Sequence, residues 1–167
     1  KVNTRLLSKL LDEGYVPVLA SLGADDDGNI YNINADTVAT RIATDLDAGK
    51  VILLPSEGQQ TGVYAAPAAC PPEFAVGECP DELQGFYIRG FTVKDFAWNG
   101  IQTRFVNNFE IVRNEAGGVG LNGIYPTISA NGLVQNNVAY GTMDTALWVA
   151  ASENVRVIGN KLSGSPI

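Results

Sequence analysis

Residues 105–127, FVNNFEIVRNEAGGVGLNGIYPT, and residues 128–150, ISANGLVQNNVAYGTMDTALWVA, are consecutive copies of one pattern. The same 23-residue period runs from Gly85 to Ile167. Self-similarity at a fixed period of about 20 to 50 residues is typical of a solenoid, and short β-rich units ending in Gly and Asn favour coiled strands over helix pairs. The stretch therefore predicts a mainly β fold, a right-handed parallel β-helix. Two aligned columns of asparagine carry the pattern: Asn108, Asn131 and Asn154, and then Asn114, Asn137 and Asn160.

Columns of apolar residues supply the expected core. Stacking each coil on the previous one builds a continuous apolar interior that no single coil can bury, with strands about 4.8 Å apart. Asparagine suits the corners, because it tolerates left-handed backbone conformations and its stacked amides can hydrogen-bond along a ladder. The column that begins with Asp95 continues as glycine and predicts a turn. The apolar columns are Ile88, Ile111, Val134 and Val157, and then Ile101, Ile124 and Leu147.

The repeat resembles the right-handed parallel β-helix family that includes pectate lyase-like and periplasmic NosD-like proteins, over about half of the chain. That resemblance implies shared coils and not shared chemistry. Gly62, Val63 and Tyr64 resemble the start of later coils, so an earlier coil is expected to begin there. Residues 66–84 include the proline-rich run APAACPPEFAVGECPDE, which predicts a loop insertion.

Residues 1–54 lack the 23-residue period and alternate helix and strand patterns. A small α/β segment, residues 1–54, is therefore expected to precede the β-helix, residues 55–167. Asn3 and Asn34 are suited to cap the two helices. The expected elements are a helix at 4–12, a buried strand at 16–22, a turn at 25–29 leading to a hairpin strand at 30–33, a helix at 35–46 and a strand at 51–54.

The segment GYVPVLASLGADDDGNIYNINADTVATRIATDLDAGKVILL, residues 14–54, resembles the acetylglutamate kinases of the amino acid kinase family. YNINADTVA is its most specific part. The resemblance implies that Asn32 holds the carboxylate of N-acetylglutamate, that Asn34 belongs to the same substrate-binding motif and that Asp36 orients the catalytic lysines. The family's glycine-rich phosphate loop and second catalytic lysine have no counterpart here. Because phosphoryl transfer depends on charge clamping, the fragment is expected to be inactive, with ATP and Mg²⁺ cofactors only of a complete kinase domain.

Simpler interpretations of these polar residues stay open. Asn34 and Asp36 also fit an ordinary helix cap and a first-turn acid. The acidic run from Asp25 to Asp27 lacks the spacing of an EF-hand loop and fits a solvated turn. The chain contains no histidine and two cysteines, so no metal site is predicted.

Cys70 and Cys79 lie in the expected loop insertion. They fit either a disulfide or two unpaired thiols. A disulfide implies an oxidising compartment. A secreted or periplasmic β-helix and a cytoplasmic kinase favour opposite answers, so the sequence leaves the localisation undecided.

A net charge of −7 disfavours nucleic acid and anionic membranes as partners. No apolar run approaches the length of a transmembrane helix, and the opening residues are too polar for a signal peptide. The oligomeric state stays open.

The β-helix could interact with carbohydrate. Lyase chemistry requires acidic residues gathered on one outer face, whereas here they fall in five different columns: Asp95, Glu110, Glu115, Asp144 and Glu153. Tyr125 and Trp148 share one column and form a candidate sugar platform, although aromatics that pack at a coil edge fit equally. We therefore expect a chimeric or truncated chain with no complete catalytic site, whose β-helix is a structural or carbohydrate-interacting scaffold. The alternatives are a kinase-related fragment and a polysaccharide lyase or hydrolase.

Overall fold

The structure is a computed structural model that describes residues 2–48, 51–53, 55, 59–70 and 79–165. Contacts divide the chain into two compact units, Lys1–Lys50 (unit 1) and Val51–Ile167 (unit 2). Each unit is described by itself. Within the residues described, no helix is both long and apolar enough to span a membrane.

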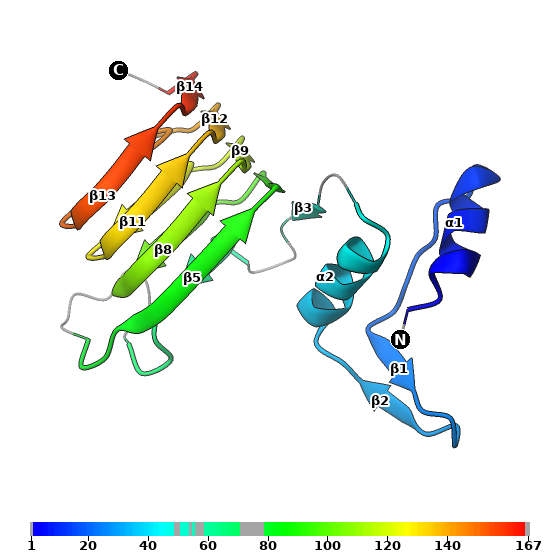
Figure 1. Cartoon of the computed structure of the whole chain (residues 1–167). Helices are drawn as coiled ribbons and strands as arrows, with labels where there is room; N and C mark the ends of the chain where they lie inside the picture. Colours follow the sequence, from blue (N-terminus) through cyan, green and yellow to red (C-terminus); the bar gives the residue numbers. More distant parts are fainter. Residues whose placement is uncertain (1, 49–50, 54, 56–58, 71–78, 166–167) are drawn as a thin grey trace. The chain divides into compact units, whose positions relative to one another are not determined.

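Unit 1 contains two helices and one hairpin. Helix α1 (Thr4–Asp12) begins where the Leu6 amide donates to the Asn3 side chain at 3.1 Å, as the sequence predicts. Strands β1 (Leu22–Ala24) and β2 (Ile30–Asn32) pair antiparallel, and helix α2 (Ala35–Asp45) follows (Figure 1). These elements confirm the α/β character expected before the repeat.

The buried strand expected at residues 16–22 is wrong. The described strand begins only at Leu22, and the side chains of Val16 and Val18 are 86% and 94% exposed. An apolar run becomes a buried strand only where neighbouring strands pair with it and a second layer covers it. Among the described residues of unit 1, the only sheet is the two-stranded hairpin, which supplies neither.

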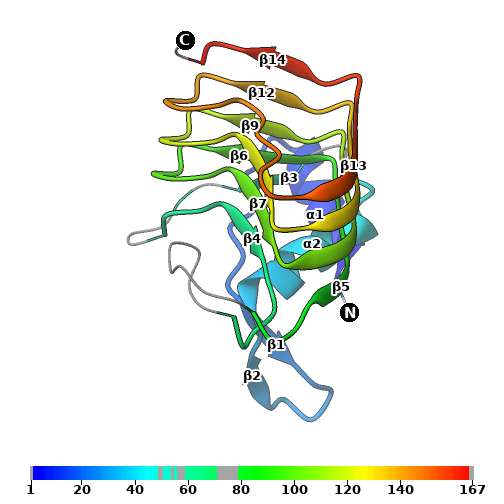
Figure 2. The ribbon, with the colours of Figure 1, turned by 90° about the vertical axis from the view of Figure 1, so that its left-hand side faces the viewer.

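Unit 2 is a parallel β-solenoid, which confirms the predicted fold class. Three sheets run along it, with strand orders β10-β7-β4, β13-β11-β8-β5 and β14-β12-β9-β6-β3 (Figures 1 and 2). The strands are β3 (Val51–Leu53), β4 (Val63–Ala65), β5 (Leu83–Arg89), β6 (Phe91–Lys94), β7 (Ile101–Arg104), β8 (Val106–Val112), β9 (Glu115–Gly117), β10 (Ile124–Thr127), β11 (Ala130–Gln135), β12 (Val138–Tyr140), β13 (Glu153–Ile158) and β14 (Lys161–Ser163).

The strand register follows the sequence period. Ile111 pairs with Ile88 on one side and with Val134 on the other, and Val134 pairs in turn with Val157. Val63 pairs with Ile101, so the early coil expected near Gly62 is present. The predicted stacking of equivalent apolar residues is therefore confirmed.

The strand Val51–Leu53 belongs to the solenoid. It pairs parallel with β6, Val51 opposite Phe91 and Leu53 opposite Val93. The sequence placed this strand with the α/β segment, before a boundary at residues 54 and 55. The contacts instead divide the units between residues 50 and 51.

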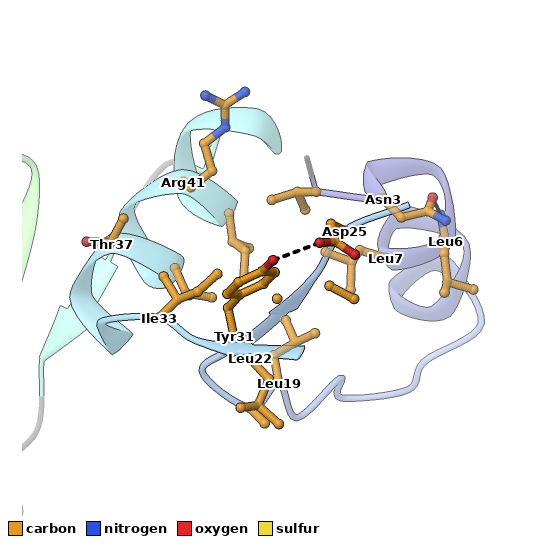
Figure 3. Close-up of a pocket in the computed structure, with 16 residues that line it drawn as sticks. Asn3, Leu6, Leu7, Leu19, Leu22, Asp25, Tyr31, Ile33, Thr37 and Arg41 are labelled. Carbon is orange, nitrogen blue, oxygen red and sulfur yellow. Dashed lines mark hydrogen bonds between the residues drawn. The ribbon is translucent and has the colours of Figure 1, made fainter. Parts of the chain in front are cut away.

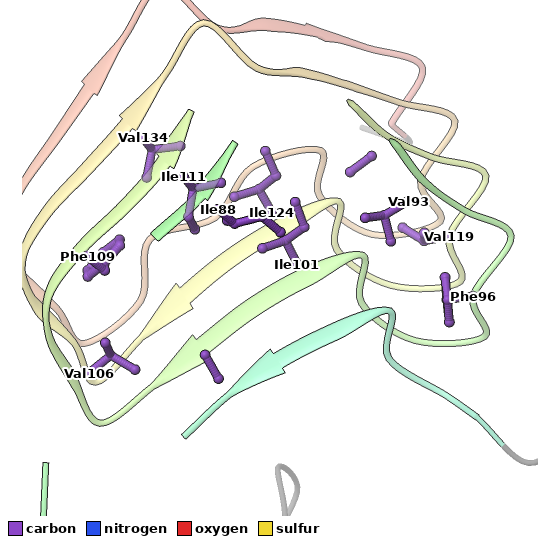
Figure 4. Packing of buried hydrophobic residues seen from close by; sticks show 12 residues of the cluster. Ile88, Val93, Phe96, Ile101, Val106, Phe109, Ile111, Val119, Ile124 and Val134 are labelled. Atoms are coloured by element: carbon purple, nitrogen blue, oxygen red, sulfur yellow. The ribbon is translucent and has the colours of Figure 1, made fainter. Parts of the chain in front are cut away.

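The solenoid interior is filled by stacked apolar side chains, shown in Figure 4. Ile101, Ile111 and Ile124 are fully buried, and Phe109 is 1% exposed. Phe109 occupies the space over Gly132, where an added Cβ would overlap its ring. The absence of a side chain at Gly132 therefore leaves the space that the Phe109 ring fills.

An asparagine ladder crosses the interior beside these apolar columns. The Asn137 side-chain oxygen accepts from the Asn114 backbone and side-chain nitrogens at 2.8 and 3.2 Å. Its side-chain nitrogen donates to the Ile111 carbonyl at 2.8 Å and to the Asn160 side-chain oxygen at 2.9 Å. The ladder ends at Phe91, whose amide donates to Asn114 at 3.0 Å. The buried side-chain amides of Asn114 and Asn137 in this ladder are thus fully hydrogen-bonded.

The corners of the coils use left-handed backbone conformations. Asn108, Asn131 and Asn154 have φ values of 64°, 52° and 50°, and the predicted turn column from Asp95 to Gly164 is also left-handed. A third such column contains Ile128, with φ of 45°. A β-branched residue is strained in this region, so residue 128 carries a local conformational penalty.

Replacing Ile128 by glycine is expected to change the free energy of unfolding of the solenoid by less than about 1 kcal/mol, because a relief of strain and a loss of burial nearly cancel. Relief of the left-handed conformation is worth about 1 to 2 kcal/mol, and the added freedom of glycine in the unfolded chain offsets about half of it. Ile128 is 40% exposed, so the loss of its buried part costs about 1 kcal/mol and offsets the remaining gain. Urea unfolding followed by tryptophan fluorescence measures the change. Val138→Gly, at a strand position 38% exposed, is the control and should destabilise; equal losses in both variants would contradict the expectation.

Candidate functional sites

Unit 1 contains a half-open cavity of about 530 Å³, bordered by α1, β1, β2 and α2 (Figure 3). Its walls are largely apolar, with Leu6, Leu7, Leu19, Leu22, Ile33 and Val38 among the lining residues, and its polar lining includes Asn3, Asp25, Thr37 and Arg41. Volume and lining fall within the usual range for small-molecule sites.

Asp25 is the anionic group of this lining. Its carboxylate accepts hydrogen bonds from the Asn29 side chain and the Tyr31 hydroxyl, both at 2.8 Å, and from the backbone amides of Asn29 and Asp27 at 2.9 and 3.1 Å. These donors, the Asn29 side chain foremost, lower the pKa of Asp25 from 3.8 to about 2. The hydrogen bond between the Tyr31 hydroxyl and the Asp25 carboxylate raises the pKa of Tyr31. The carboxylate is thus ionised at neutral pH and fixes the hairpin turn.

The Asp25 network predicts an acid-sensitive hairpin. Because the pKa is lower in the folded state, the stabilisation is fully present above about pH 4 and is lost as the pH falls towards 2. An NMR titration of the Asp25 carboxyl should give a pKa near 2. In Asn29→Ala and Tyr31→Phe the value should rise towards 3.8. An unshifted value in the unmodified chain would contradict this interpretation of the turn.

Of the kinase-like residues, Asn32 and Asn34 are not among the described residues that line the cavity. Asn32 ends β2 and is exposed. The Asn34 side-chain oxygen accepts from the Thr37 amide at 3.2 Å, so it caps α2. Asp36 lies in the first turn of α2, and its side chain is outside the described part of the structure. The cavity lining includes their neighbours Ile33 and Thr37 instead.

Sequence reasoning missed the cavity and its polar lining. The run DDDGNIY was interpreted as a solvated turn, which is correct for the backbone, but the turn also aims the Asp25 carboxylate at Tyr31. Asp25 and Asn29 at spacing i, i+4 across a Gly28 of positive φ were the available signal. Arg41 pairs with Asp45 at 2.9 Å, so its charge is already compensated.

The two rings of the candidate sugar platform on the solenoid contact each other. The Tyr125 and Trp148 rings stack on each other, with centroids 5.1 Å apart and planes 20° from parallel. Tyr125 also stands beside Gln102 in the strand register. Trp148 is 46% exposed. One face of the Tyr125 ring therefore packs against one face of the Trp148 ring.

A second polar cluster lies on the sheet containing β6, β9 and β12. Glu115 accepts a hydrogen bond from the Tyr140 hydroxyl at 2.8 Å and pairs with Lys94 at 3.1 Å. Tyr140 and then Glu115 raise the pKa of Lys94 above its ordinary value. These two hydrogen bonds therefore favour the protonated form of Lys94. Gly117 leaves the space that the Tyr140 ring fills.

No cluster of three or more metal-binding side chains occurs among the residues that the structure describes. Cys70 and Cys79, whose Cα atoms are 5.1 Å apart, are joined by a disulfide. The segment 71–78 between them lies outside the described residues.

Comparison with known proteins finds a partial similarity at the N-terminal end of the chain. Residues 1–67 match the amino acid kinase family. The match therefore covers all of unit 1 and continues into strands β3 and β4 of the solenoid. No solved structure matches the chain.

The particular relatives are acetylglutamate kinases. The enzyme of Trichormus variabilis is 40% identical over 89 residues, which is 53% of this chain and 30% of the relative. That of Prochlorococcus marinus strain NATL1A is 59% identical over 54 residues, 32% of this chain and 18% of the relative. That of Methanopyrus kandleri is 56% identical over 54 residues, 32% of this chain and 22% of the relative. The chain thus spans less than a third of the length of these relatives.

Proposed function

We propose that this chain is a non-catalytic protein in which a parallel β-solenoid serves as a structural scaffold attached to a fragment related to acetylglutamate kinase. The observation that carries the proposal is the stack of Tyr125 on Trp148. A sugar platform requires ring faces turned to solvent, whereas these rings use facing sides to pack against each other in successive coils. The aromatic column thus acts as packing between coils.

The kinase-related part supports the same conclusion. Phosphoryl transfer requires cations and a phosphate cradle to converge on one group. In this fragment the Asn34 amide serves as a helix cap and Arg41 pairs with Asp45. The Asn34 and Arg41 side chains therefore make local contacts within helix α2.

A coupled assay with ATP, Mg²⁺ and N-acetylglutamate tests the kinase part. We expect no turnover above that of Asp36→Ala. Turnover that Asp36→Ala abolishes would contradict the proposal and favour a kinase-related activity.

Carbohydrate binding is the second candidate function, because Trp148 keeps 46% of its surface exposed. A single free ring would contribute on the order of 1 kcal/mol, whereas millimolar binding requires about 4 kcal/mol, so any binding at this ring is weak. A lyase activity has less support, since a raised pKa keeps Lys94 protonated and unsuited to removing a proton.

Titration with oligogalacturonides and neutral glycans, followed by tryptophan fluorescence, separates scaffold from carbohydrate-binding protein. The scaffold predicts no saturable change. A saturable change that disappears in Trp148→Ala would favour carbohydrate binding at the aromatic column. Trp98→Phe removes the other tryptophan signal and is the matched control.

A further inference from the structure

We propose that the half-open cavity of unit 1 binds a small organic cation with an apolar body, of the quaternary ammonium class. The cavity lies wholly within unit 1, bordered by α1, β1, β2 and α2 (Figure 3). This inference goes beyond the proposed function, because it concerns unit 1 and holds whether or not the solenoid binds carbohydrate. Three features of the lining carry it: uncovered leucine side chains, an ionised carboxylate and an exposed aromatic ring.

The apolar part of the lining is open to water. Leu6, Leu19 and Leu22 are 52%, 52% and 57% exposed, whereas Leu7 is 6% exposed. Removing such apolar surface from water favours the binding of a ligand that has an apolar body. The volume of about 530 Å³ suits a small organic molecule.

The charge of the lining favours a cation. Asp25 and Arg41 are the two charged side chains among the described lining residues. The Arg41 guanidinium pairs with Asp45 at 2.9 Å, which offsets its positive charge. All the groups that donate to the Asp25 carboxylate are uncharged, so its negative charge is not offset. Unit 1 as a whole has eight acidic and five basic residues, and its net charge therefore has the same sign.

The hydrogen bonds of Asp25 narrow the class of cation. Its Oδ1 atom accepts from the backbone amides of Asp27 and Asn29, and its Oδ2 atom accepts from the Asn29 side chain and the Tyr31 hydroxyl. A carboxylate offers about four acceptor positions, so these donors fill them. The N–H groups of a primary ammonium ion would find no free acceptor here, and their loss of water would cost free energy. A quaternary ammonium ion carries the charge without any N–H group.

Tyr31 supplies the aromatic ring. It lines the cavity and is 52% exposed. Its hydroxyl donates to the Asp25 carboxylate at 2.8 Å, so this hydrogen bond holds the ring and the negative charge beside each other. The face of an aromatic ring attracts a cation that lies within about 6 Å of its centre, and quaternary ammonium ligands are bound in this way. A cation over Tyr31 would therefore be attracted by the ring and by the carboxylate together.

An NMR titration of the full-length chain with benzyltrimethylammonium tests the site. We expect saturable shifts of backbone amides in the lining, such as those of Ile33 and Thr37, and none in unit 2. 3-Phenylpropionate, an aromatic probe of opposite charge, should bind at least about fivefold more weakly. The absence of saturable shifts in the lining would overturn the proposal, and so would equal or tighter binding of the anionic probe.

Two matched variants test the role of the carboxylate. Asp25→Asn should weaken the binding of benzyltrimethylammonium by about three- to fivefold, which is the contribution of an exposed ion pair. Asp12→Asn removes the same charge from an exposed position of α1 outside the described lining, and it should change the affinity less than about twofold. Equal weakening in both variants would show a general effect of net charge and would contradict binding at Asp25. If Asp25→Asn does not fold, the comparison of the two probes on the unaltered chain decides.

Discussion

Replacing Asn137 by alanine is expected to lower the free energy of unfolding of the solenoid by about 3 to 5 kcal/mol. The side chain is fully buried and makes four hydrogen bonds, two to Asn114, one to Ile111 and one to Asn160. Truncation leaves the Ile111 carbonyl and the Asn114 amide without these partners, and each buried orphan costs about 1 to 3 kcal/mol. The small cavity adds to the loss.

Urea unfolding followed by tryptophan fluorescence measures this loss. Asn107→Ala is the matched control, since it removes the same atoms from a side chain on the outside of β8 that bonds to Glu82 and Asn131. The control should lose less than about 1 kcal/mol, as surface substitutions usually do. Equal losses in both variants would show that the internal ladder does not hold the coils together.

Replacing Phe109 by alanine is the second large effect, with an expected loss of about 3 to 5 kcal/mol. Phe109 is 1% exposed and belongs to the buried apolar cluster (Figure 4), and its ring lies over Gly132. The truncation creates a cavity that the parallel strands on both sides cannot close, because their hydrogen bonds fix their spacing. Tyr87→Ala, on the same sheet but 61% exposed, is the control and should lose far less.

The contact between Phe109 and Gly132 allows a sharper test. Gly132→Ala alone should destabilise by about 1 to 3 kcal/mol through overpacking. In the double variant with Phe109→Ala, the new methyl group enters the space that the ring vacates. The two losses should therefore add up to more than the loss in the double variant. Strict additivity would contradict the packing described.

Most of the solenoid could be predicted from the sequence, because each coil makes the same kinds of contact with the next coil. Asn137 donates to the Ile111 carbonyl as Asn160 does to the equivalent Val134 carbonyl one coil later. The period alone therefore predicts the pairing of Ile111 with Val134. Short helices with side-chain caps, such as the one after Asn3, were also predictable, because capping is local.

The other features could not be predicted, because they depend on which segments pack or pair with each other, and a sequence pattern does not identify these segments. The run around Val16 and Val18 has the composition of a buried strand, but burial requires neighbouring strands that unit 1 does not supply within the described residues. The column that joins Tyr125 to Trp148 was predictable, whereas the direction in which the rings face was not. The assignment of Val51–Leu53 to the solenoid likewise depends on which edge is available to pair.

The central claim is that a kinase-related α/β unit and a β-solenoid coexist as separate folding units in one chain. Both helices described by the structure lie in unit 1 and both tryptophans lie in unit 2, so each unit has its own spectroscopic signal. Unit 1 contributes Leu7 to the buried apolar side chains, whereas unit 2 contributes a continuous cluster, so unit 1 should unfold first. The decisive measurement is urea unfolding of the full-length chain followed by circular dichroism at about 222 nm and by tryptophan fluorescence. The account predicts that the helix signal is lost at a lower urea concentration than the fluorescence signal; a single transition with the same midpoint for both probes would contradict it.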